Sequence, residues 1–342
     1  MGLTFLHSFA QTRKIMSAIQ RLAVFSSGGD APGMNACIRA VVRTALVHKL
    51  RVYGIMRGYQ GMIDDEFKPL TSRSVSNIIQ RGGTILKTAR SMEFMTDAGM
   101  QKAYENLKQH QIDAIVAIGG DGTFKGAEAF CQRYPDIRIM GIPGTIDNDL
   151  TGTDYTLGFD TAVNTVIEAI DKIRDTAASH DRCFFIEVMG RDSGCLALWS
   201  GLAGGAEDIL LPEKHTDFDA LVNKLEEGKA NNKSSSIILV AEGEKNGGAA
   251  EVAQHLKERL AHYDTKVTVL GHVQRGGSPT AFDRILAAKF GVWAVEALME
   301  GDNRKMVGIR KGEKHLLPFA SATRQHEPLD MEMLRINRIL AT

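Results

Sequence analysis

The stretch of sequence best suited to chemistry runs from Pro143 to Asp149 and reads Pro-Gly-Thr-Ile-Asp-Asn-Asp. An extended backbone points alternate side chains the same way, so Asp147 and Asp149 would repel each other unless a cation lies between them. One such carboxylate can accept a proton while the other handles Mg²⁺, a division of tasks that suits phosphoryl transfer. Asp-Asn-Asp is also favourable turn chemistry, and the segment alone leaves a polar turn open as the alternative.

Two glycine-rich segments have the composition of phosphate-binding loops. Residues 28–35 read Gly-Gly-Asp-Ala-Pro-Gly-Met-Asn, and residues 119–123 read Gly-Gly-Asp-Gly-Thr. Glycine lets the backbone approach a phosphate closely, and a helix N-terminus offers free N–H groups. Asp121 would repel a naked triphosphate but suits one that is bridged by Mg²⁺. Neither segment matches the Rossmann or Walker pattern, and a tight turn or a helix cap by Thr123 is the alternative.

Short apolar runs that alternate with helix-period segments must position these loops. The runs predicted to form buried strands are 21–26, 51–56, 113–118, 137–142, 183–188, 209–211, 236–241 and 266–270. Apolar residues at helical spacing follow the first run between Ile38 and Ala45, and a longer series runs from Val163 to Ile173. The alternation predicts an α/β fold with two Rossmann-like, three-layer domains built on parallel-rich sheets.

The segments that follow the predicted strands hold most of the chemically capable residues. Glycine, aspartate, arginine, glutamate and histidine gather at the ends of six runs, in residues 27–30, 119–123, 143–149, 189–191, 242–243 and 271–277. Ligands of parallel sheets bind at the carboxyl ends of the strands. We therefore expect an active site in the cleft between the two domains.

Composition limits the class of protein. The chain has 342 residues, of which 44% are hydrophobic and 24% charged, with 41 basic and 41 acidic side chains. This length suggests two domains, and the balanced charge predicts no nucleic-acid partner and no membrane association. Cys37, Cys131, Cys183 and Cys195 lack metal-ligand spacing. They are expected to be buried thiols in a reducing, cytoplasmic compartment.

Residues 1–17 are expected to form an N-terminal extension. They include Phe5, Leu6 and Phe9, but no long apolar core and no small-residue cleavage site, which argues against a signal peptide. Met16 lies shortly before the first predicted strand and is a candidate start of translation. A disordered or loosely docked extension is the alternative.

Five segments, in this order along the chain, strongly resemble the 6-phosphofructokinase family and its short, bacterial-type members in particular. They are residues 28–35, 119–123, 143–149, 189–191 and 271–277. The resemblance implies transfer of a phosphoryl group from MgATP to the 1-hydroxyl of fructose 6-phosphate, which gives fructose 1,6-bisphosphate and ADP in glycolysis. It also implies a homotetramer with shared sites. The expected domains are residues 18–157 plus 273–323 for ATP, and 158–272 plus 324–342 for fructose 6-phosphate.

The resemblance implies a role for each matching residue. Asp147 would be the general base, Thr145 would hold the transferring phosphoryl group, and Arg191 would neutralise its charge. Asp121 would hold Mg²⁺, with Asp149 assisting. The ATP site would consist of Gly29, Arg90, Ser91, Gly120, Asp121, Gly122 and Thr123. The sugar-phosphate site would consist of Thr145, Ile146, Asp147, Met189, Gly190, Arg191, Glu242, Lys266, His272 and Arg275, with Arg182 from a neighbouring subunit.

The chain departs from the family pattern near both substrates. Lys266 stands where the family usually has arginine, six residues before His272. A lysine keeps the charge but loses the two-point grip on phosphate, so we expect weaker or altered substrate affinity. Ser91 and Met92 replace a frequent Phe-Pro after Arg90, which predicts different packing beside the adenine. Taken singly, His272 would be an ordinary loop histidine and Arg90 a solvated surface arginine.

The residues that match the family's effector site for ADP or phosphoenolpyruvate form a mixed set. They are Arg39, Arg43, Arg174, Glu207 and Lys233. Ser72 stands where many members have arginine. The loss of a guanidinium weakens charge-assisted contacts to an anionic effector, so altered or weak regulation is expected.

Two glycines favour ATP over pyrophosphate as the phosphoryl donor. Relatives that use pyrophosphate typically have aspartate at the position of Gly122 and lysine at that of Gly144. Both positions are glycine here, which leaves room for a nucleotide. A pyrophosphate-dependent enzyme is the second hypothesis. A nucleotide-sensing subunit without activity is the third, and the presence of Asp121, Asp147 and Asp149 argues against it.

Overall fold

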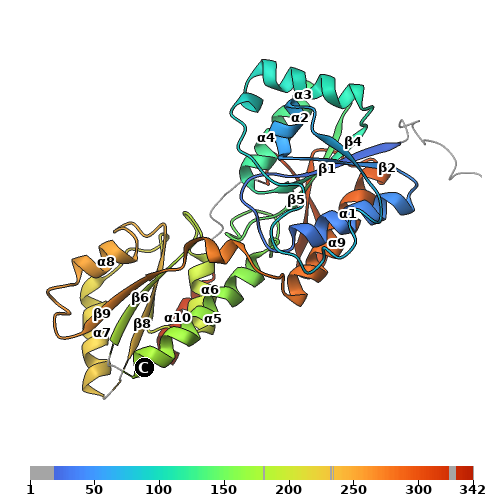
Figure 1. Cartoon of the computed structure of the whole chain (residues 1–342). Coiled ribbons are helices and arrows are strands. Elements are labelled where there is room, and N and C mark those ends of the chain that lie inside the picture. The colour runs from blue at the N-terminus through green and yellow to red at the C-terminus, as the bar shows by residue number, and fades with distance from the viewer. Residues whose placement is uncertain (1–18, 180–181, 232, 234, 323–328, 342) are drawn as a thin grey trace, which may run out of the picture.

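Two parallel-rich sheets organise the chain into two lobes (Figure 1). The computed structural model describes residues 19–179, 182–231, 233, 235–322 and 329–341. The predicted extension at residues 1–17 and the predicted domain limit between residues 323 and 324 lie outside these residues. Among the described helices, none has both the length and the apolarity that a bilayer crossing needs.

The larger sheet has seven strands in the order β11-β10-β5-β4-β1-β2-β3. Its strands are β1 (Arg21–Ser26), β2 (Arg51–Ile55), β3 (Phe67–Leu70), β4 (Ala114–Gly119), β5 (Arg138–Pro143), β10 (Lys305–Arg310) and β11 (Glu313–Pro318). Neighbours run parallel except for the β2–β3 and β10–β11 pairs at the two edges.

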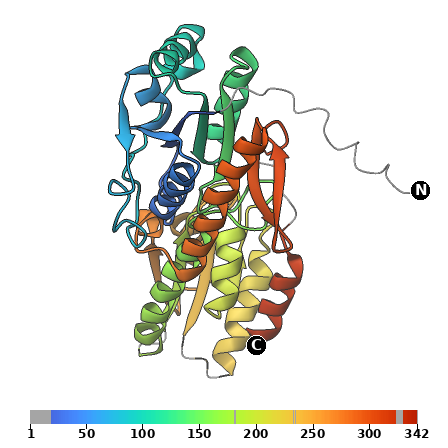
Figure 2. The ribbon, with the colours of Figure 1, turned by 90° about the vertical axis from the view of Figure 1, so that its right-hand side faces the viewer.

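Helices cover both faces of this sheet, because alternate residues of its central strands point to opposite sides. Leu22 and Val24 of β1 pack under α1 (Met34–Val47) and α9 (Ala281–Glu300), which lie side by side (Figure 2). Ala23 and Phe25 pack on the other side, under α2 (Gly58–Ile63), α3 (Asp97–Gln109) and α4 (Asp121–Arg133). The continuous apolar runs in the sequence reflect this burial on both faces.

The smaller sheet has four strands in the order β7-β8-β6-β9, all parallel. They are β6 (Arg182–Val188), β7 (Asp208–Leu210), β8 (Ser236–Ala241) and β9 (Asp264–Val269). One face packs against α5 (Phe159–Ala178), α6 (Cys195–Ala203) and α10 (Met331–Leu340), and the other against α7 (Phe218–Ala230) and α8 (Ala249–His255). The predicted α/β fold with two three-layer units is thereby confirmed.

The sequence pattern located eight of the strands to within one or two residues and missed β3, β10 and β11. β3 contains Lys68 and Pro69 and lies half-exposed at a sheet edge, so it lacks an apolar run. β10 and β11 form a hairpin through Lys311 and Gly312, which have φ angles of 52° and 84°. Two consecutive positive φ angles are typical of a type I′ hairpin turn. The four cysteines are free and buried, as predicted.

The first turns of α5 and α9 fasten two of the chain segments that connect the lobes. Asp283 of α9 accepts hydrogen bonds from the backbone N–H groups of Gly158 (2.8 Å) and Thr161 (2.9 Å), and from the Thr161 hydroxyl (2.5 Å). The Thr280 hydroxyl donates in return to Asp160. Asp283 is fully buried, and this burial raises the pKa of its carboxyl to about 6.

Candidate active site

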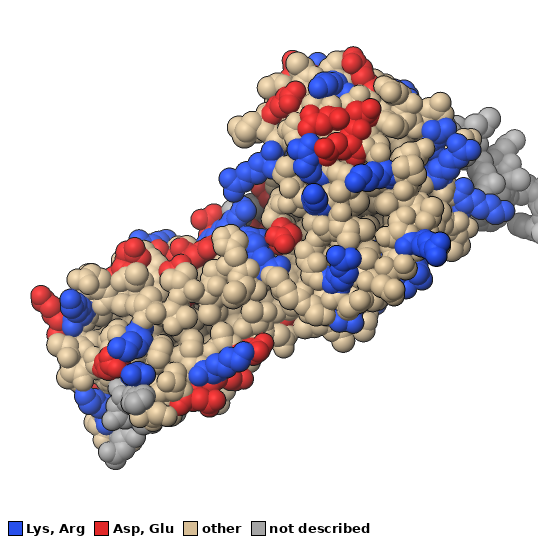
Figure 3. Space-filling view, viewed as in Figure 1, with Lys and Arg blue, Asp and Glu red and all other residues tan. Residues whose placement is uncertain are grey.

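A cavity of about 640 Å³, called here the cleft cavity, lies where loops of the larger sheet face Arg191 and Arg275. Basic side chains, with acidic ones among them, surround the hollow between the lobes (Figure 3). Twelve predicted site residues line the cleft cavity: Gly29, Arg90, Ser91, Gly120, Asp121, Gly122, Thr123, Thr145, Asp147, Asp149, Arg191 and Arg275. The structure thus brings these residues together from six separate segments. Four of them follow the carboxyl ends of β1, β4, β5 and β6, one is the loop that holds Arg90 and Ser91, and one is η2 (Gly271–Arg275).

The turn after β5 presents a buried carboxylate to a cation from the other lobe. Asp147 is 3% exposed, and its backbone N–H donates to the hydroxyl of Thr145 at 3.2 Å. Nε of Arg191 lies 3.7 Å from Oδ2 of Asp147. Arg191 stands in the left-handed region at φ 53°, next to Gly190 at φ 141°, in the loop after β6. A carboxylate and a cation therefore face the same part of the cleft cavity.

The loop between β4 and α4 lies against the backbone of the neighbouring strand. A Cβ at Gly119 would stand 2.3 Å from Oγ1 of Thr123 and 2.6 Å from the Ser27 carbonyl oxygen, so no larger residue fits there. At Gly122, by contrast, a Cβ would meet no atom within 4 Å. The Tyr59 hydroxyl donates to the Thr123 carbonyl at 2.6 Å and fixes the first turn of α4. Tyr59 is a residue that sequence reasoning missed, because it lies in none of the recognised segments.

The donor set of the cleft cavity fits Mg²⁺ that is shared with a substrate. Asp121 and Asp149 line the same cavity, and Asp121 makes an ion pair of 2.7 Å with Lys125. Among the described residues, no group of three or more His, Cys, Asp or Glu side chains is arranged to hold a metal ion. Mg²⁺ usually takes one or two carboxylates and completes its shell with waters and phosphate oxygens. Asp121 and Asp149, which line one cavity, match that habit.

The loops after β6 and β8 and the turn η2 support one another at the other end of the site. Oε1 of Glu242 accepts hydrogen bonds from the backbone N–H groups of Arg191 (2.6 Å) and Gly190 (3.3 Å). Gln274 is fully buried and accepts from the backbone N–H of Met189 at 3.1 Å. His272 lies in the same turn as Gln274. The backbone of Met189 is thus tied to the turn that carries His272, through a glutamine that the predicted site left out.

Arg275 links this end to the first glycine loop. Its Nη1 atom donates to the Asp30 carbonyl at 3.4 Å. The same nitrogen lies close to where a Cβ of Gly29 would be, so a larger residue at this position would displace the Arg275 guanidinium. Ile146, in contrast, is fully buried in the core. It can offer only its backbone to a substrate.

Arg182 and Lys266 lie away from the cleft cavity of their own chain. Arg182 stands at the amino end of β6, opposite the end that leads to Met189, and Lys266 lies on the edge strand β9. Both pair with Asp264, at 2.8 and 2.6 Å. The Lys266 ammonium, followed by the Arg182 guanidinium, holds the pKa of the Asp264 carboxyl below its ordinary value.

The five predicted effector residues form two groups within one chain. Arg39 and Arg43 lie on α1, in the lobe of the larger sheet. In the other lobe, Arg174 of α5 donates to the carbonyls of Gly204 (2.6 Å) and Gly205 (2.8 Å). Glu207 and Lys233 form an ion pair of 3.2 Å in that lobe.

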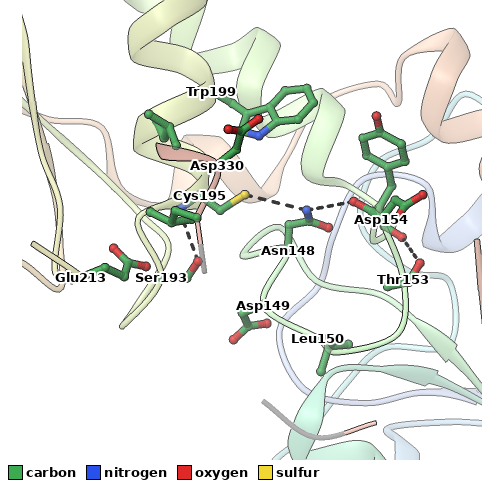
Figure 4. Close-up of a pocket in the computed structure, with 13 residues that line it drawn as sticks. Asn148, Asp149, Leu150, Thr153, Asp154, Ser193, Cys195, Trp199, Glu213 and Asp330 are labelled. Atoms are coloured by element: carbon green, nitrogen blue, oxygen red, sulfur yellow. Dashed lines mark hydrogen bonds between the residues drawn. The ribbon is translucent and has the colours of Figure 1, made fainter. Parts of the chain in front are cut away.

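A second cavity of about 320 Å³ lies behind the turn after β5, residues 145–149 (Figure 4). Its lining includes Asn148, Cys195, Trp199 and Glu213, and it shares Asp149 with the cleft cavity. The segment from residue 147 to residue 149 therefore separates two cavities, with Asp147 on one side and Asn148 on the other.

Comparisons match most of this chain to known proteins. The sequence model of the family described as phosphofructokinase matches residues 21–298. ATP-dependent 6-phosphofructokinase 1 of Thermus thermophilus is 56% identical over 323 residues, which cover 94% of this chain and 100% of that protein. ATP-dependent 6-phosphofructokinase 2 of Bacteroides thetaiotaomicron is 51% identical over 326 residues, which cover 95% of this chain and 100% of that protein.

Solved structures share the fold. The phosphofructokinase of Saccharomyces cerevisiae superimposes with a TM-score of 0.85 at 35% identity, over 94% of this chain and 48% of the yeast chain. A pyrophosphate-dependent phosphofructokinase of Marinobacter aquaeolei gives a TM-score of 0.81 at 22% identity, over 94% of this chain and 91% of the other. At that identity the second likeness concerns the fold alone. From the matching family model and the identity to relatives over their full length, this chain belongs to the phosphofructokinase family.

Proposed function

We propose that this chain is an ATP-dependent 6-phosphofructokinase, which phosphorylates the 1-hydroxyl of fructose 6-phosphate in glycolysis. Identity above 50% to relatives of that name, over their full length, supports the reaction. The observation that carries the proposal is the buried Asp147 carboxylate facing Arg191 in a cavity that two glycine loops also line.

Asp147 is placed to act as the general base. It takes the proton of the sugar 1-hydroxyl while the new O–P bond forms and the bond between the γ-phosphorus and its bridging oxygen breaks. Thr145 accepts a hydrogen bond from the Asp147 backbone, so its own hydroxyl hydrogen remains available for an oxygen of the transferring group. Arg191 supplies a positive charge beside the same group, where preorganised charge lowers the barrier.

The nucleotide is proposed to lie along the glycine loops, with its phosphates over Gly29 and Gly120 to Thr123. Asp121 and Asp149 would hold Mg²⁺, which when bound neutralises phosphate charge and acts as a Lewis acid. With Mg²⁺ bound, the Asp121 carboxylate would either leave its ion pair with Lys125 or be shared between Lys125 and the metal. Arg90 and Ser91 line the cavity further along, next to Met92 and Met95.

The sugar phosphate is proposed to bind at the opposite end, against Met189, Gly190, Glu242, His272 and Arg275. Arg182 and Lys266 face away from this site, so we propose that they reach the site of a neighbouring subunit in a homotetramer. The same proposal includes domain limits at 157/158 and 272/273 and a cytoplasmic location. It also includes an effector site, in which Arg39 and Arg43 of one subunit would meet three residues of another. These three are Arg174, Glu207 and Lys233.

The donor is proposed to be ATP because the space at Gly122 is open, whereas an aspartate there would place a negative charge among the nucleotide phosphates. The test is turnover of fructose 6-phosphate by the purified chain with ATP or with pyrophosphate, with fructose 1,6-bisphosphate measured as the product. Turnover with ATP and Mg²⁺ is expected. Preference for pyrophosphate would replace the proposal with the pyrophosphate-dependent alternative, and absence of turnover with both donors would refute it.

A further inference from the structure

Asn148 stands between the proposed base Asp147 and the proposed metal ligand Asp149 and has φ 48°. This left-handed conformation is unfavourable for most residues, but asparagine tolerates it. Figure 4 shows the Asn148 side chain directed between Cys195 and Asp154, while the Asp149 side chain points another way. The side chain of this left-handed residue thus points away from that of Asp149.

The Asn148 amide holds this turn by hydrogen bonds within the lobe of the larger sheet. Its Oδ1 accepts the backbone N–H of Thr156 at 2.9 Å, and its Nδ2 donates to the Asp154 carbonyl at 3.2 Å. The Thr156 hydroxyl, which is almost fully buried, donates to the carbonyl of Thr145 at 2.6 Å. Residues 145–149 are called here the catalytic turn. The loop from residue 154 to residue 156 is therefore hydrogen-bonded to this turn at Thr145 and at Asn148.

The same amide also contacts the lobe of the smaller sheet. Nδ2 of Asn148 lies 3.8 Å from Sγ of Cys195, the first residue of α6. Only three residues separate Cys195 from Arg191, whose guanidinium faces Asp147 across the cleft. Two contacts therefore join the turn after β5 to the loop between β6 and α6. The Asp147–Arg191 contact lies at the cleft cavity, and the Asn148–Cys195 contact lies at the second cavity.

We infer that Asn148 is a positioning residue that sets the separation between the base Asp147 and Arg191 by holding the catalytic turn against the start of α6. It touches no reacting atom in this scheme. The expected change in kcat rests on the proposed function. The expected change in the Arg191–Asp147 separation does not depend on which phosphoryl donor is used.

The variants Asn148→Gly and Asn148→Asp separate the side chain from the backbone conformation. Glycine adopts positive φ without strain but has no amide, so it removes the contacts and leaves the turn permitted. Aspartate keeps the shape but cannot donate to the Asp154 carbonyl or to Cys195, and it adds a third negative charge to the segment. Asn77→Gly is the matched control, since Asn77 has φ 55° and is exposed, away from the cleft cavity.

Steady-state kinetics with ATP and fructose 6-phosphate give the first readout. N148G is expected to lower kcat by about 10- to 100-fold, the scale for small misplacement of reacting groups, with both KM values within about threefold of the wild type. N148D is expected to lower kcat at least as much, and N77G not at all. A wild-type kcat for N148G would overturn the inference, as would a loss expressed only in KM.

Crystal structures give a second readout that does not depend on activity. In N148G the Arg191–Asp147 separation is expected to exceed the 4 Å range of an ion pair, and an unchanged separation would overturn the inference even if the wild type proved inactive with ATP. Inactivity of the wild type and N77G would count against the proposed function alone. Should N148G fail to fold, Cys195→Ala removes the side-chain contact across the cleft, along with some core packing, and is expected to lower kcat about threefold, the equivalent of one weak contact. An unchanged kcat in that variant would also overturn it.

Discussion

Arg191 Nε and Asp147 Oδ2 lie 3.7 Å apart, although one belongs to the loop after β6 of the smaller sheet and the other to the turn after β5 of the larger one. Asp147 is buried, whereas about half of the Arg191 side chain is exposed. The buried carboxylate and the half-exposed cation therefore meet only when the lobes are held at this distance. The catalytic geometry depends on the relation between two sheets rather than on either one alone.

Replacement of Asp147 by asparagine is expected to lower kcat by about 10²- to 10⁴-fold, the usual contribution of a positioned general base. The amide has nearly the same shape but cannot accept the proton of the sugar hydroxyl. ATP binding measured by calorimetry should persist, because glycine loops and not Asp147 form most of the proposed nucleotide site. Turnover at the wild-type rate would show that another group takes the proton.

Much of this arrangement could be predicted from the sequence, because parallel strands are marked by apolar runs and their ligand-binding ends by glycine and charged residues. Residues such as Gly120 and Asp121 directly follow a fully buried strand, so their place at the cleft follows from the fold class. The supporting contacts could not be predicted in this way. Tyr59, Asn148 and Gln274 act through partners far away in sequence or through a single backbone angle, and no periodic pattern records either.

The residues that lie apart from the cleft show a second limit. Arg182 and Lys266 are placed by the strands they belong to, at the start of β6 and on the edge strand β9. No feature of one chain brings them to a substrate, and their proposed role depends on a neighbouring subunit. A sequence pattern can identify such residues through a family resemblance, but the chain alone does not supply the surface they would complete.

Introduction of aspartate at Gly122 tests the basis for the choice of donor. A Cβ at this position would meet no atom within 4 Å, so the variant is expected to fold normally. Its carboxylate would enter the cleft cavity beside Asp121 and repel the nucleotide phosphates. KM for ATP should rise at least tenfold, equivalent to about 1.4 kcal/mol of lost binding. Gly122→Asn adds the same bulk without charge, and an equal rise in both variants would indicate a steric cause instead.

Exchange of Lys266 for arginine tests the departure from the family pattern. A guanidinium can grip a phosphate at two points where an ammonium offers a single charge. If a neighbouring subunit places this residue on the sugar phosphate, KM for fructose 6-phosphate should fall by about tenfold, the effect of one further charge-assisted hydrogen bond, with kcat unchanged. Lys172→Arg on α5 is the control, because Lys172 pairs only with Glu168 on the helix surface. An unchanged KM would remove Lys266 from the site.

The buried carboxyl of Asp283, at the junction of α5 and α9, is expected to make the free energy of unfolding depend on pH. Burial raises its pKa to about 6 in the folded chain from 3.8, against the opposing effect of the hydrogen bonds from Thr161 and Gly158. The folded state therefore binds a proton more tightly than the unfolded state. This contribution to stability is complete below pH 3.8 and is lost as the pH rises through about 6.

The variant Asp283→Asn has no carboxyl group to titrate and lacks this term, while every other titrating group is common to both proteins. Between pH 4.5 and 7, the free energy of unfolding of the wild type is expected to fall by about 2 kcal/mol relative to D283N, from the difference between the two pKa values. Urea unfolding of both proteins at the two pH values measures this difference. A constant difference would mean that the Asp283 carboxylate is already ionised throughout, with its three hydrogen bonds outweighing the cost of burial.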